Sequence, residues 1–296
     1  MPDRSAPSHD AGFAEVADRC YLARFEFLDV NVGLVAGERG LLMVDTLASE
    51  AAARRAVEHV RALGLGDVVA VVNTHEHFDH TFGNVTVSEA YDGPPILAHE
   101  DAAAGLLRSA AEVQRQAAED GEDARYAEVA ATRVLAPTET FSSARVVDLG
   151  DRQVEVLHPG RGHTAGDTVV RVPDADALFA GDLVEESALR HGVPGFGADS
   201  YPLEWPLTLD LVLGLLTPTS VVVPGHGIPV DREFVSEQRS AIGVVAETIR
   251  DLASRGVPVR DALGQAEWPY PAEQLGDAVR RGYEQLPRAQ RRLPLI

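Results

Sequence analysis

Four strand-like segments of this chain each end at a histidine or an aspartate, and this pattern limits the fold more than any other feature. The run VVAVVNT precedes His75, a run closing in HPGRG precedes His163, DALFAG precedes Asp182, and SVVVPG precedes His226. Open α/β sheets bind ligands beyond the carboxyl ends of their strands, where side chains from several strands meet. We therefore expect these four side chains to line one pocket.

The first of these positions opens the densest group of polar side chains, His75-Glu76-His77-Phe78-Asp79-His80. In an extended chain residues 75, 77 and 79 share one side, and His80 begins a new direction where a helix can start. Three imidazoles and a carboxylate this close are costly to bury, because each needs a hydrogen-bond or charge partner. A metal ion satisfies them together, so the group predicts metal ligation rather than a merely polar loop.

Strand and helix alternate along the chain, which is typical of layered α/β folds. Strands are expected over 20–45 (a meander with a turn at 37–40), 68–73, 96–98, between 145 and 181, and over 220–224; helices are expected over 49–63, 100–132 (with a break near Gly121), 207–216, 231–254 and 272–286. The meander, helix and buried strand recur after about residue 140, which favours a sandwich of two halves. We divide the chain into a flexible arm (1–17), one domain (18–254) and a C-terminal helical extension packed on it (255–296).

The charge balance excludes several kinds of chemistry. Acidic residues number 46 and basic residues 26, for a net charge of −20, and every basic residue is arginine. Without lysine there is no Walker A lysine, no kinase strand lysine, no pyridoxal Schiff base and no Ser-Lys dyad. An acidic surface also opposes the electrostatic grip on phosphates that nucleic-acid binding needs. We therefore expect a small-molecule substrate and no nucleic-acid partner.

Cys20 is the only cysteine, so no disulfide can form within the chain and a disulfide-stapled secreted fold is excluded. The N-terminal residues contain no apolar leader, and no later stretch is apolar for the length of a membrane span. We expect a soluble cytoplasmic protein without a membrane partner. The sequence leaves a homodimer open, and it does not decide whether the 100–137 insert and the WPYP tail at 268–271 roof the site or make a dimer contact.

Taken together, the motifs resemble those of the metallo-β-lactamase fold superfamily. They are Thr74-His75-x-His77-x-Asp79-His80, Gly162-His163-Thr164, Gly181-Asp182 and Gly225-His226-Gly227, in this order, and the resemblance covers about residues 18–250. It implies an α/β architecture, an αββα sandwich of two mixed β-sheets flanked by helices, with a dinuclear metal site along one edge.

The resemblance also implies which residues bind metal. His75, His77 and His163 would hold one ion, Asp79, His80 and His226 the second, and Asp182 would bridge the two. These ligands suit two Zn²⁺ ions first, with iron or manganese as alternatives because no thiolate biases the choice. β-Lactamases of the best-known subclass carry cysteine at the bridging position and hold the drug carboxylate with a lysine. This chain has an aspartate there and no lysine, so penicillin hydrolysis is not expected to be its main activity.

An aspartate bridge is instead similar to that of glyoxalase II, lactonases, thioesterases and phosphodiesterases of the superfamily. We expect a zinc-dependent hydrolase that cleaves a small neutral or cationic ester, thioester or lactone through a metal-bridging hydroxide, with Asp79 as the proton acceptor. Three alternatives stay open: a mononuclear iron oxygenase resembling persulfide dioxygenases, a flavoprotein-partnered or non-catalytic metal domain, and a metal-dependent phosphodiesterase or nuclease. The complete second ligand set favours two metals over one.

Other residues have two interpretations each. Asp45 either supports the metal-binding histidines or is an acid of a turn or a helix N-cap. Thr164 with Asp167 either orients a ligand or caps the turn before the next strand. The loop 191–206 either lines a substrate pocket or simply packs, and its candidate residues are His191, Phe196, Tyr201 and Trp205. The remaining histidines are expected at the surface or in turns and Cys20 in the core; these histidines are His9, His59, His99 and His158.

Overall fold

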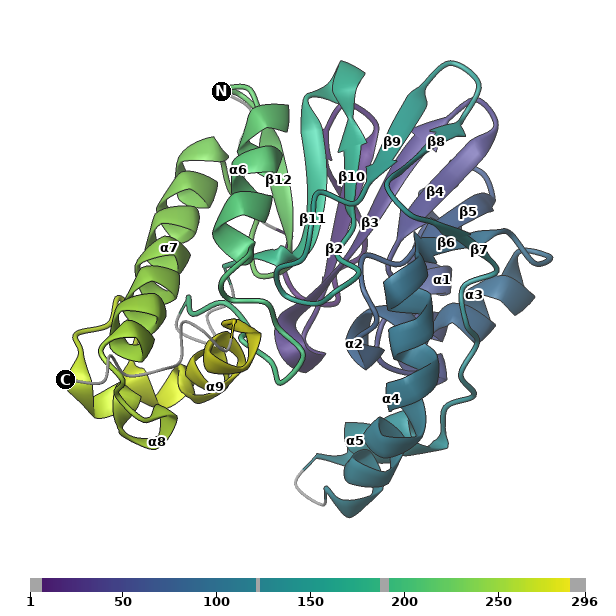
Figure 1. Ribbon diagram of the computed structural model, residues 1–296. Helices are drawn as coiled ribbons and strands as arrows, with labels where there is room; N and C mark the ends of the chain where they lie inside the picture. The colour runs from purple at the N-terminus through teal and green to yellow at the C-terminus, as the bar shows by residue number, and fades with distance from the viewer. Residues whose placement is uncertain (1–6, 121–122, 187–191, 288–296) are drawn as a thin grey trace.

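The computed structural model describes residues 7–120, 123–186 and 192–287 (Figure 1). The first half of the chain forms one β-layer and its helices, with these bounds: β1 (Ala14–Ala17), β2 (Cys20–Phe25), the 3-10 turn η1 (Phe27–Asp29), β3 (Val30–Gly37), β4 (Gly40–Val44), α1 (Glu50–Leu63), β5 (Val68–Val72), α2 (Phe78–Thr81), α3 (Asn84–Ala90), β6 (Ile96–His99), α4 (Glu100–Glu119), α5 (Ala124–Ala131) and β7 (Glu139–Phe141).

The second half forms the other β-layer and its helices. Their bounds are β8 (Ala144–Asp148), β9 (Gln153–Leu157), β10 (Val169–Val172), η2 (Pro173–Ala175), β11 (Ala177–Glu185), α6 (Trp205–Leu215), β12 (Val221–His226), α7 (Arg232–Ser254), α8 (Val259–Ala262), η4 (Leu263–Gln265), η5 (Ala272–Gln274) and α9 (Gly276–Gln285). No helix among the described residues is both long and apolar enough to cross a membrane.

Local sequence explains most of these bounds. The Ser49 side chain accepts a hydrogen bond from Ala52 N and so caps α1, and Gly64 ends that helix in the left-handed region at φ +67°. The turn between β3 and β4 falls at residues 37–40, where Gly37 pairs with Gly40. One expectation is wrong. Residues 14–17, assigned to a flexible arm because they are small and polar, form β1, which pairs with β2 from Ala14 to Ala17.

Each half contributes a mixed sheet, as expected. In the first layer β4, β5, β6 and β7 run parallel and β1 to β4 antiparallel; in the second, β11 and β12 run parallel and β8 to β11 antiparallel. The layers join at one place, where His226 of β12 pairs with Val30 of β3. This seam puts a candidate metal ligand at the junction of the two halves.

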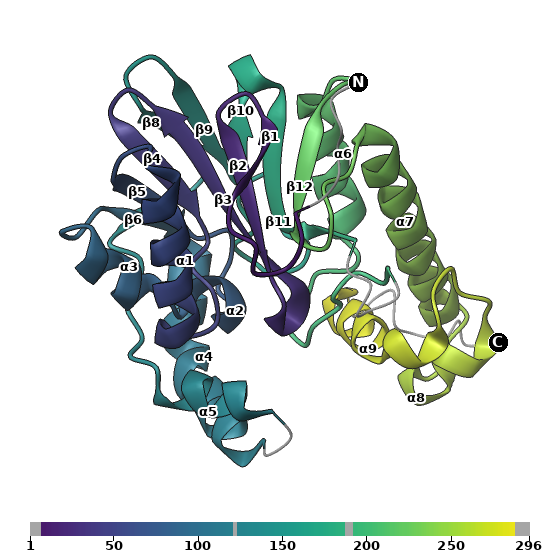
Figure 2. The same cartoon turned by 180° about the vertical axis from the view of Figure 1, so that it is seen from behind.

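The core confirms the αββα order of layers. Alternating residues of β3 face opposite sides: Leu34 packs toward α1, whereas Val35 packs between the two sheets. The cluster between the sheets joins Leu42 and Val72 of the first layer to Val170 and Val223 of the second. A third cluster packs the second layer against α6, α7 and α9. Figures 1 and 2 show α1 outside one layer and α6 and α7 outside the other.

The expected helical insert consists of α4 and α5, which lie below the first layer in Figure 1. They pack on each other and against α2 through a small apolar cluster that contains Phe82, Leu106 and Val129. Because α2 carries part of the motif 75–80, the insert lies next to the candidate ligands. The insert therefore roofs one side of the site.

Candidate metal centre

The first four candidate ligands follow β5 directly. Residues 75–77 continue past the strand end, and α2 begins at Phe78, with His77 in an extended conformation at its N-terminus (φ −65°, ψ 148°). The chain thus changes direction at Phe78, two residues before the expected place at His80, so Asp79 does not share a side with His75 and His77 as expected but groups with His80. The side chain of Asn73 donates to the His80 carbonyl at 3.3 Å and holds this turn.

The other three candidate ligands come from the second layer. His163 lies in the loop after β9, Asp182 lies within β11, and His226 ends β12. Glycine makes this approach sterically feasible at two places. Gly181 has φ +52°, and a Cβ there would lie 2.7 Å from Cβ of Thr74; a Cβ at Gly225 would overlap the carboxylate of Asp182.

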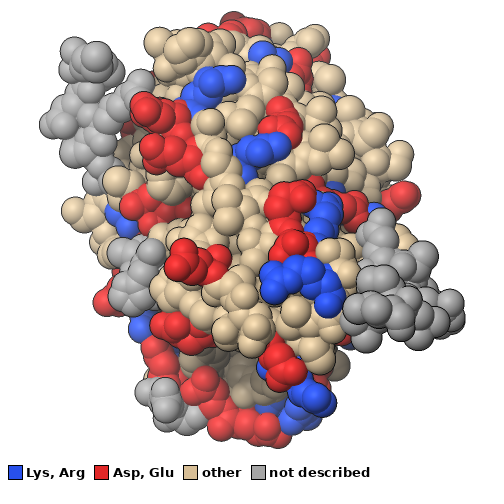
Figure 3. Space-filling model, turned by 60° about the vertical axis from the view of Figure 1, so that its left-hand side comes forward, with Lys and Arg blue, Asp and Glu red and all other residues tan. Residues whose placement is uncertain are grey.

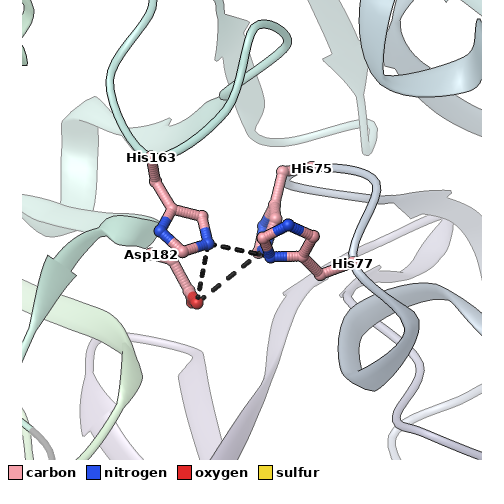
Figure 4. Close-up of side chains that lie close together, drawn as sticks. All are labelled: His75, His77, His163 and Asp182. Carbon is pink, nitrogen blue, oxygen red and sulfur yellow. Dashed lines mark hydrogen bonds and ion pairs between the residues drawn. The ribbon is translucent and has the colours of Figure 1, made fainter. Parts of the chain in front are cut away.

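One group consists of His75, His77, His163 and Asp182, whose ligand atoms all lie within 4.8 Å of one another (Figure 4). Nε2 of His163 lies 2.9 Å from Nδ1 of His77 and 3.4 Å from Oδ2 of Asp182. Nε2 of His75 lies 3.8 Å from the same carboxylate oxygen. Three imidazoles and one carboxylate thus point into a common centre.

The second group consists of Asp79, His80 and His226. Nε2 of His80 and Nε2 of His226 are 3.3 Å apart, and Oδ2 of Asp79 lies 3.6 and 3.5 Å from them. Asp182 reaches this group as well: its carboxylate oxygens lie 3.2 Å from Nε2 of His80 and 3.1 Å from Nε2 of His226. The geometry therefore places Asp182 between the two groups.

The outer nitrogen of each histidine faces a hydrogen-bonding or acidic group. The pairs are His75 Nδ1 with Thr74 Oγ1 (3.0 Å), His77 Nε2 with Asp199 Oδ2 (2.9 Å), His80 Nδ1 with Asp45 Oδ2 (2.8 Å), His226 Nδ1 with the Leu28 carbonyl (2.8 Å) and His163 Nδ1 with Glu185 Oε1 (3.8 Å). An imidazole that donates outward presents a lone pair inward, which is the form that binds metal.

The inner atoms test whether a metal fits. Among the described residues, Nε2 of His75 is buried and has no hydrogen-bond partner. Buried polar atoms without partners are costly, and inward lone pairs on neighbouring imidazoles repel one another. A cation at the centre of each group removes both costs, so the donor set fits divalent metal ions with nitrogen and oxygen preference.

The close packing of these imidazoles and carboxylates also shifts their pKa values in the protein without metal. Burial lowers the pKa of His75 well below its usual value, and the neighbouring His80 adds to this. Burial also opposes the charged form of His80, but the carboxylates of Asp182 and Asp79 outweigh it and raise the pKa well above the usual value. Burial would raise the pKa of Asp182, yet His226 and the other imidazoles hold it well below its usual range. Asp182 is therefore held in its ionised form by the imidazoles around it.

At the edge of the site, burial and neighbouring carboxylates again shift the pKa values of the histidines in opposite directions. Burial opposes a charge on His77, but the hydrogen bond with Asp199 raises its pKa to about 9, and that of Asp199 falls to about 2. The pKa of His226 rises to about 9 because Asp182 outweighs burial. Glu76 differs: its side chain points away toward α4, and burial raises its pKa to about 6.

Asp45 supports the histidines rather than capping a helix. It is 2% exposed, and its Oδ1 accepts from Thr74 N at 2.8 Å while its Oδ2 accepts from Thr74 Oγ1 and from His80 Nδ1, both at 2.8 Å. One carboxylate thus fixes the ring of His80 and, through Thr74, the start of the ligand motif. Of the two interpretations, the contacts favour the first.

We expect Asp45→Asn to lower kcat/KM by about 10- to 100-fold, the range typical for partners of metal ligands. An amide retains the size of the side chain but cannot accept from three donors without turning an N–H toward one of them. Steady-state kinetics with matched metal loading tests this. The variant Asp67→Asn, an exposed change of the same kind, should behave as wild type; equal losses in both would contradict the role of Asp45.

For Thr164 and Asp167 the contacts favour the second interpretation, in which the pair caps the turn before the next strand. Thr164 N and Oγ1 both donate to the Asp167 carboxylate, at 3.0 and 2.8 Å. The pair closes the turn that carries His163. Thr164 therefore shapes the loop in which His163 lies.

A cavity of about 440 Å³ opens over the two groups. The described residues that line it are Leu28, His77, Phe78, Asp79, Tyr126, His163, Asp182, Gly195, Phe196, Gly197 and His226. Phe196 is thus a wall of the cavity, as expected. His191 lies outside the described residues.

The structure corrects two pocket candidates. Trp205 is fully buried: its Nε1 donates to the Leu183 carbonyl at 3.2 Å, and its ring packs edge-on against His163 from behind. Tyr201 is not among the described lining residues, because its ring stacks under the guanidinium groups of Arg161 and Arg281. Both interpretations of the loop 191–206 therefore apply to parts of it. Phe196 lines the cavity, whereas Trp205 packs in the core.

Several site residues had not been identified from the sequence. Asp199 and Glu185 face outer nitrogens of His77 and His163, and Leu28, Phe78 and Tyr126 line the cavity. Only Phe78 and Glu185 had a local signal, since one lies inside the ligand motif and the other ends the strand that carries Asp182.

The four histidines that were expected at the surface or in turns have different surroundings in the structure. His9 is largely exposed yet bonds to buried Asp29, and His59 packs beside Phe25. The surface expectation is wrong for His99, which is 5% exposed and stacks on His158 with ring centroids 3.9 Å apart. Cys20 is fully buried at the start of β2, as expected.

The fold and the site define an αββα protein whose sheet edge holds two groups of residues suited to divalent metal ions. A family model described as the metallo-beta-lactamase superfamily matches residues 26–226. The chain belongs to this superfamily, and the resemblance seen in its motifs is confirmed.

Curated relatives and solved structures agree with this. Metallo-beta-lactamase type 2 of Bacillus cereus is 30% identical over 194 residues, 66% of this chain and 65% of the relative. Acyl-coenzyme A thioesterase MBLAC2 of Homo sapiens is 31% identical over 196 residues, 62% of this chain and 61% of the relative. The matches thus span just under two thirds of these relatives. The sec-alkylsulfatase Pisa1 from Pseudomonas sp. superimposes with a TM-score of 0.74 at 16% identity, over 93% of this chain and 50% of that chain, which shows the fold alone.

Proposed function

We propose that this protein is a dinuclear metal-dependent hydrolase of small, uncharged esters, thioesters or lactones, with zinc as the native metal. The observation that carries the proposal is the position of Asp182, whose carboxylate lies within 3.8 Å of an imidazole nitrogen from each of the two ligand groups. Two divalent cations held here would lower the pKa of a shared water and polarise a substrate carbonyl.

The chain's own residues supply the rest of the chemistry. Asp79 lines the cavity and is the acidic group best placed to take up a proton from the attacking water and pass it to the leaving group. Asp182 keeps its negative charge between the two histidine groups. Asp45 and Asp199 hold His80 and His77 in the orientation that directs a nitrogen inward.

The cavity supports an uncharged substrate. Its described walls are apolar or aromatic at Leu28, Phe78, Tyr126 and Phe196, and the charged side chains among them are the carboxylates and imidazoles of the ligand groups. On the face in Figure 3, basic groups (blue) lie beside acidic groups (red). Two such ion pairs among the described residues are Arg239–Asp210 and Arg250–Glu247. A neutral acyl group thus fits the walls of the cavity, and no arginine is among the described residues that line it.

The similarity to acyl-coenzyme A thioesterase MBLAC2 supports thioester or ester chemistry, and the similarity to metallo-beta-lactamase type 2 supports hydrolysis of a carbonyl compound. For this chain we place β-lactams second, because it has no lysine with which to hold a substrate carboxylate.

Elemental analysis of the purified protein followed by a substrate panel tests the proposal. We expect two zinc ions per chain and the highest kcat/KM for a neutral thioester, ester or lactone, above that for bis-p-nitrophenyl phosphate or benzylpenicillin. One iron per chain with oxygen uptake on a persulfide would overturn the hydrolase in favour of the oxygenase. Highest activity on the phosphodiester would overturn the substrate class.

A further inference from the structure

The turn η1 contains two consecutive residues in the left-handed region, and neither is glycine. Leu28 has φ 62° and ψ 7°, and Asp29 has φ 56°. Leucine rarely adopts this conformation, which persists only where the surroundings enforce it. Asp29 is also buried, with 3% of its surface exposed. A strained turn with a buried carboxylate at this place calls for a physical cause.

This turn and the residues after it hold the segment that carries His226. The Leu28 carbonyl accepts from His226 Nδ1 at 2.8 Å, and the Asp29 carbonyl accepts from Gly227 N at 3.4 Å. The Asn31 side chain donates to the carbonyls of Pro224 and Gly227 at 2.8 and 2.9 Å. The Leu28 side chain lines the cavity at the same time. In an ordinary right-handed or extended turn the Leu28 carbonyl would point elsewhere.

Two basic side chains hold the Asp29 carboxylate. Oδ1 of Asp29 receives Nη2 of Arg24 at 2.7 Å and faces Nε2 of His9 at 2.6 Å. Arg24 belongs to β2, and its carbonyl accepts from Asp10 N at 2.8 Å, which fastens the segment around His9 to the sheet. The carboxylate is therefore anchored from the sheet and from the N-terminal segment together.

We infer that Asp29 is a positioning residue for the metal ligand His226: Arg24 and His9 fix its carboxylate, this fixes the left-handed turn, and the Leu28 carbonyl then orients the imidazole. The inference rests on the proposed metal centre and assigns a role to His9, which the sequence placed in a loose arm. The contacts of this turn with the ligands run to His226 and to its neighbours Pro224 and Gly227, so we expect the effect on the second group.

Metal titration of the apoprotein by chelator competition tests this, with His226→Ala as the reference that marks which binding step belongs to the second group. We expect Asp29→Asn to weaken that same step about tenfold, with the other step changed by less than about twofold. Asparagine is suitable because it tolerates the left-handed region and has the same size. His9→Ala should shift the same step in the same direction by a smaller factor. Asp10→Asn, an exposed change in the same segment, is the matched control and should shift neither step.

The outcomes separate the inference from the proposed function. If wild type binds no divalent ion, the proposed function falls and the inference falls with it. If wild type binds two ions and both Asp29→Asn and His9→Ala keep the His226 step unchanged, the inference alone is overturned. A purely structural role for Asp29 would instead lower the melting temperature of the apoprotein and weaken both steps equally, which also overturns it. Should Asp29→Asn not fold, His9→Ala decides, because that side chain is 41% exposed and its removal leaves Arg24 in place.

Discussion

Asp182→Asn should lower kcat/KM by well over a hundredfold while the protein keeps its fold. Removing a partner of a metal ligand already costs about 10- to 100-fold, and Asp182 is the one described carboxylate within 3.8 Å of imidazole nitrogens in both ligand groups. Asparagine keeps the shape but removes the negative charge that balances the surrounding histidines. Steady-state kinetics on the best substrate, with far-UV circular dichroism and metal content measured on the same samples, gives the result.

The matched control for this change is Asp210→Asn, which alters an exposed carboxylate paired with Arg239. Exposed ion pairs contribute little, so its kcat/KM should stay within about twofold of wild type. Full activity in Asp182→Asn, with a normal spectrum and normal metal content, would refute the bridging assignment. Loss of activity together with loss of the folded spectrum would show instead that the carboxylate serves the fold.

The layered fold and the convergence of the ligands could be predicted because both depend on local patterns. VVAVVN reads as a buried strand whatever lies around it, and β5 indeed runs from Val68 to Val72. Ser49 and Gly64 bound α1 through their own backbone chemistry. Once the strands were identified, the rule that strand ends share an edge brought His75 and His226 together without knowledge of any contact. Asp182 departs from this rule, because it lies inside β11, which continues to Glu185.

The partners of the ligands could not be predicted, because they come from distant parts of the chain. Asp199 meets His77 across 122 positions, and the carbonyl of Leu28 meets His226 across 198, so no spacing in the sequence marks either pair. Trp205 was misjudged for the opposite reason. Its place in the loop made it a candidate for the substrate pocket, but the residue begins α6 and is buried in the core against His163. The sequence pattern therefore identifies the residues that can bind metal, whereas the tertiary packing determines which distant groups orient them.

Removal of metal should abolish activity and lower the melting temperature, and added zinc should restore both. A ligand that binds only the folded state at a thousand times its Kd adds about 4 kcal/mol of stability. For a chain of this size that corresponds to a shift of roughly 8 °C. The shift has this sign because the ligand groups draw on both β-layers, at β5 and α2 in one and at β11 and β12 in the other, and so exist only when the layers are joined.

Differential scanning fluorimetry of protein dialysed against EDTA, with activity measured in parallel, tests this expectation, and EDTA presaturated with zinc controls for the chelator itself. Asp182→Asn provides the internal comparison, because losing the carboxylate shared by both groups should remove most of the zinc-dependent rise in melting temperature while leaving the metal-free value close to that of wild type. A protein shown by elemental analysis to be free of metal, yet turning over substrate at the wild-type rate, would contradict the metal centre, and with it every role assigned above to the five histidines that face Asp182, Asp79 or each other.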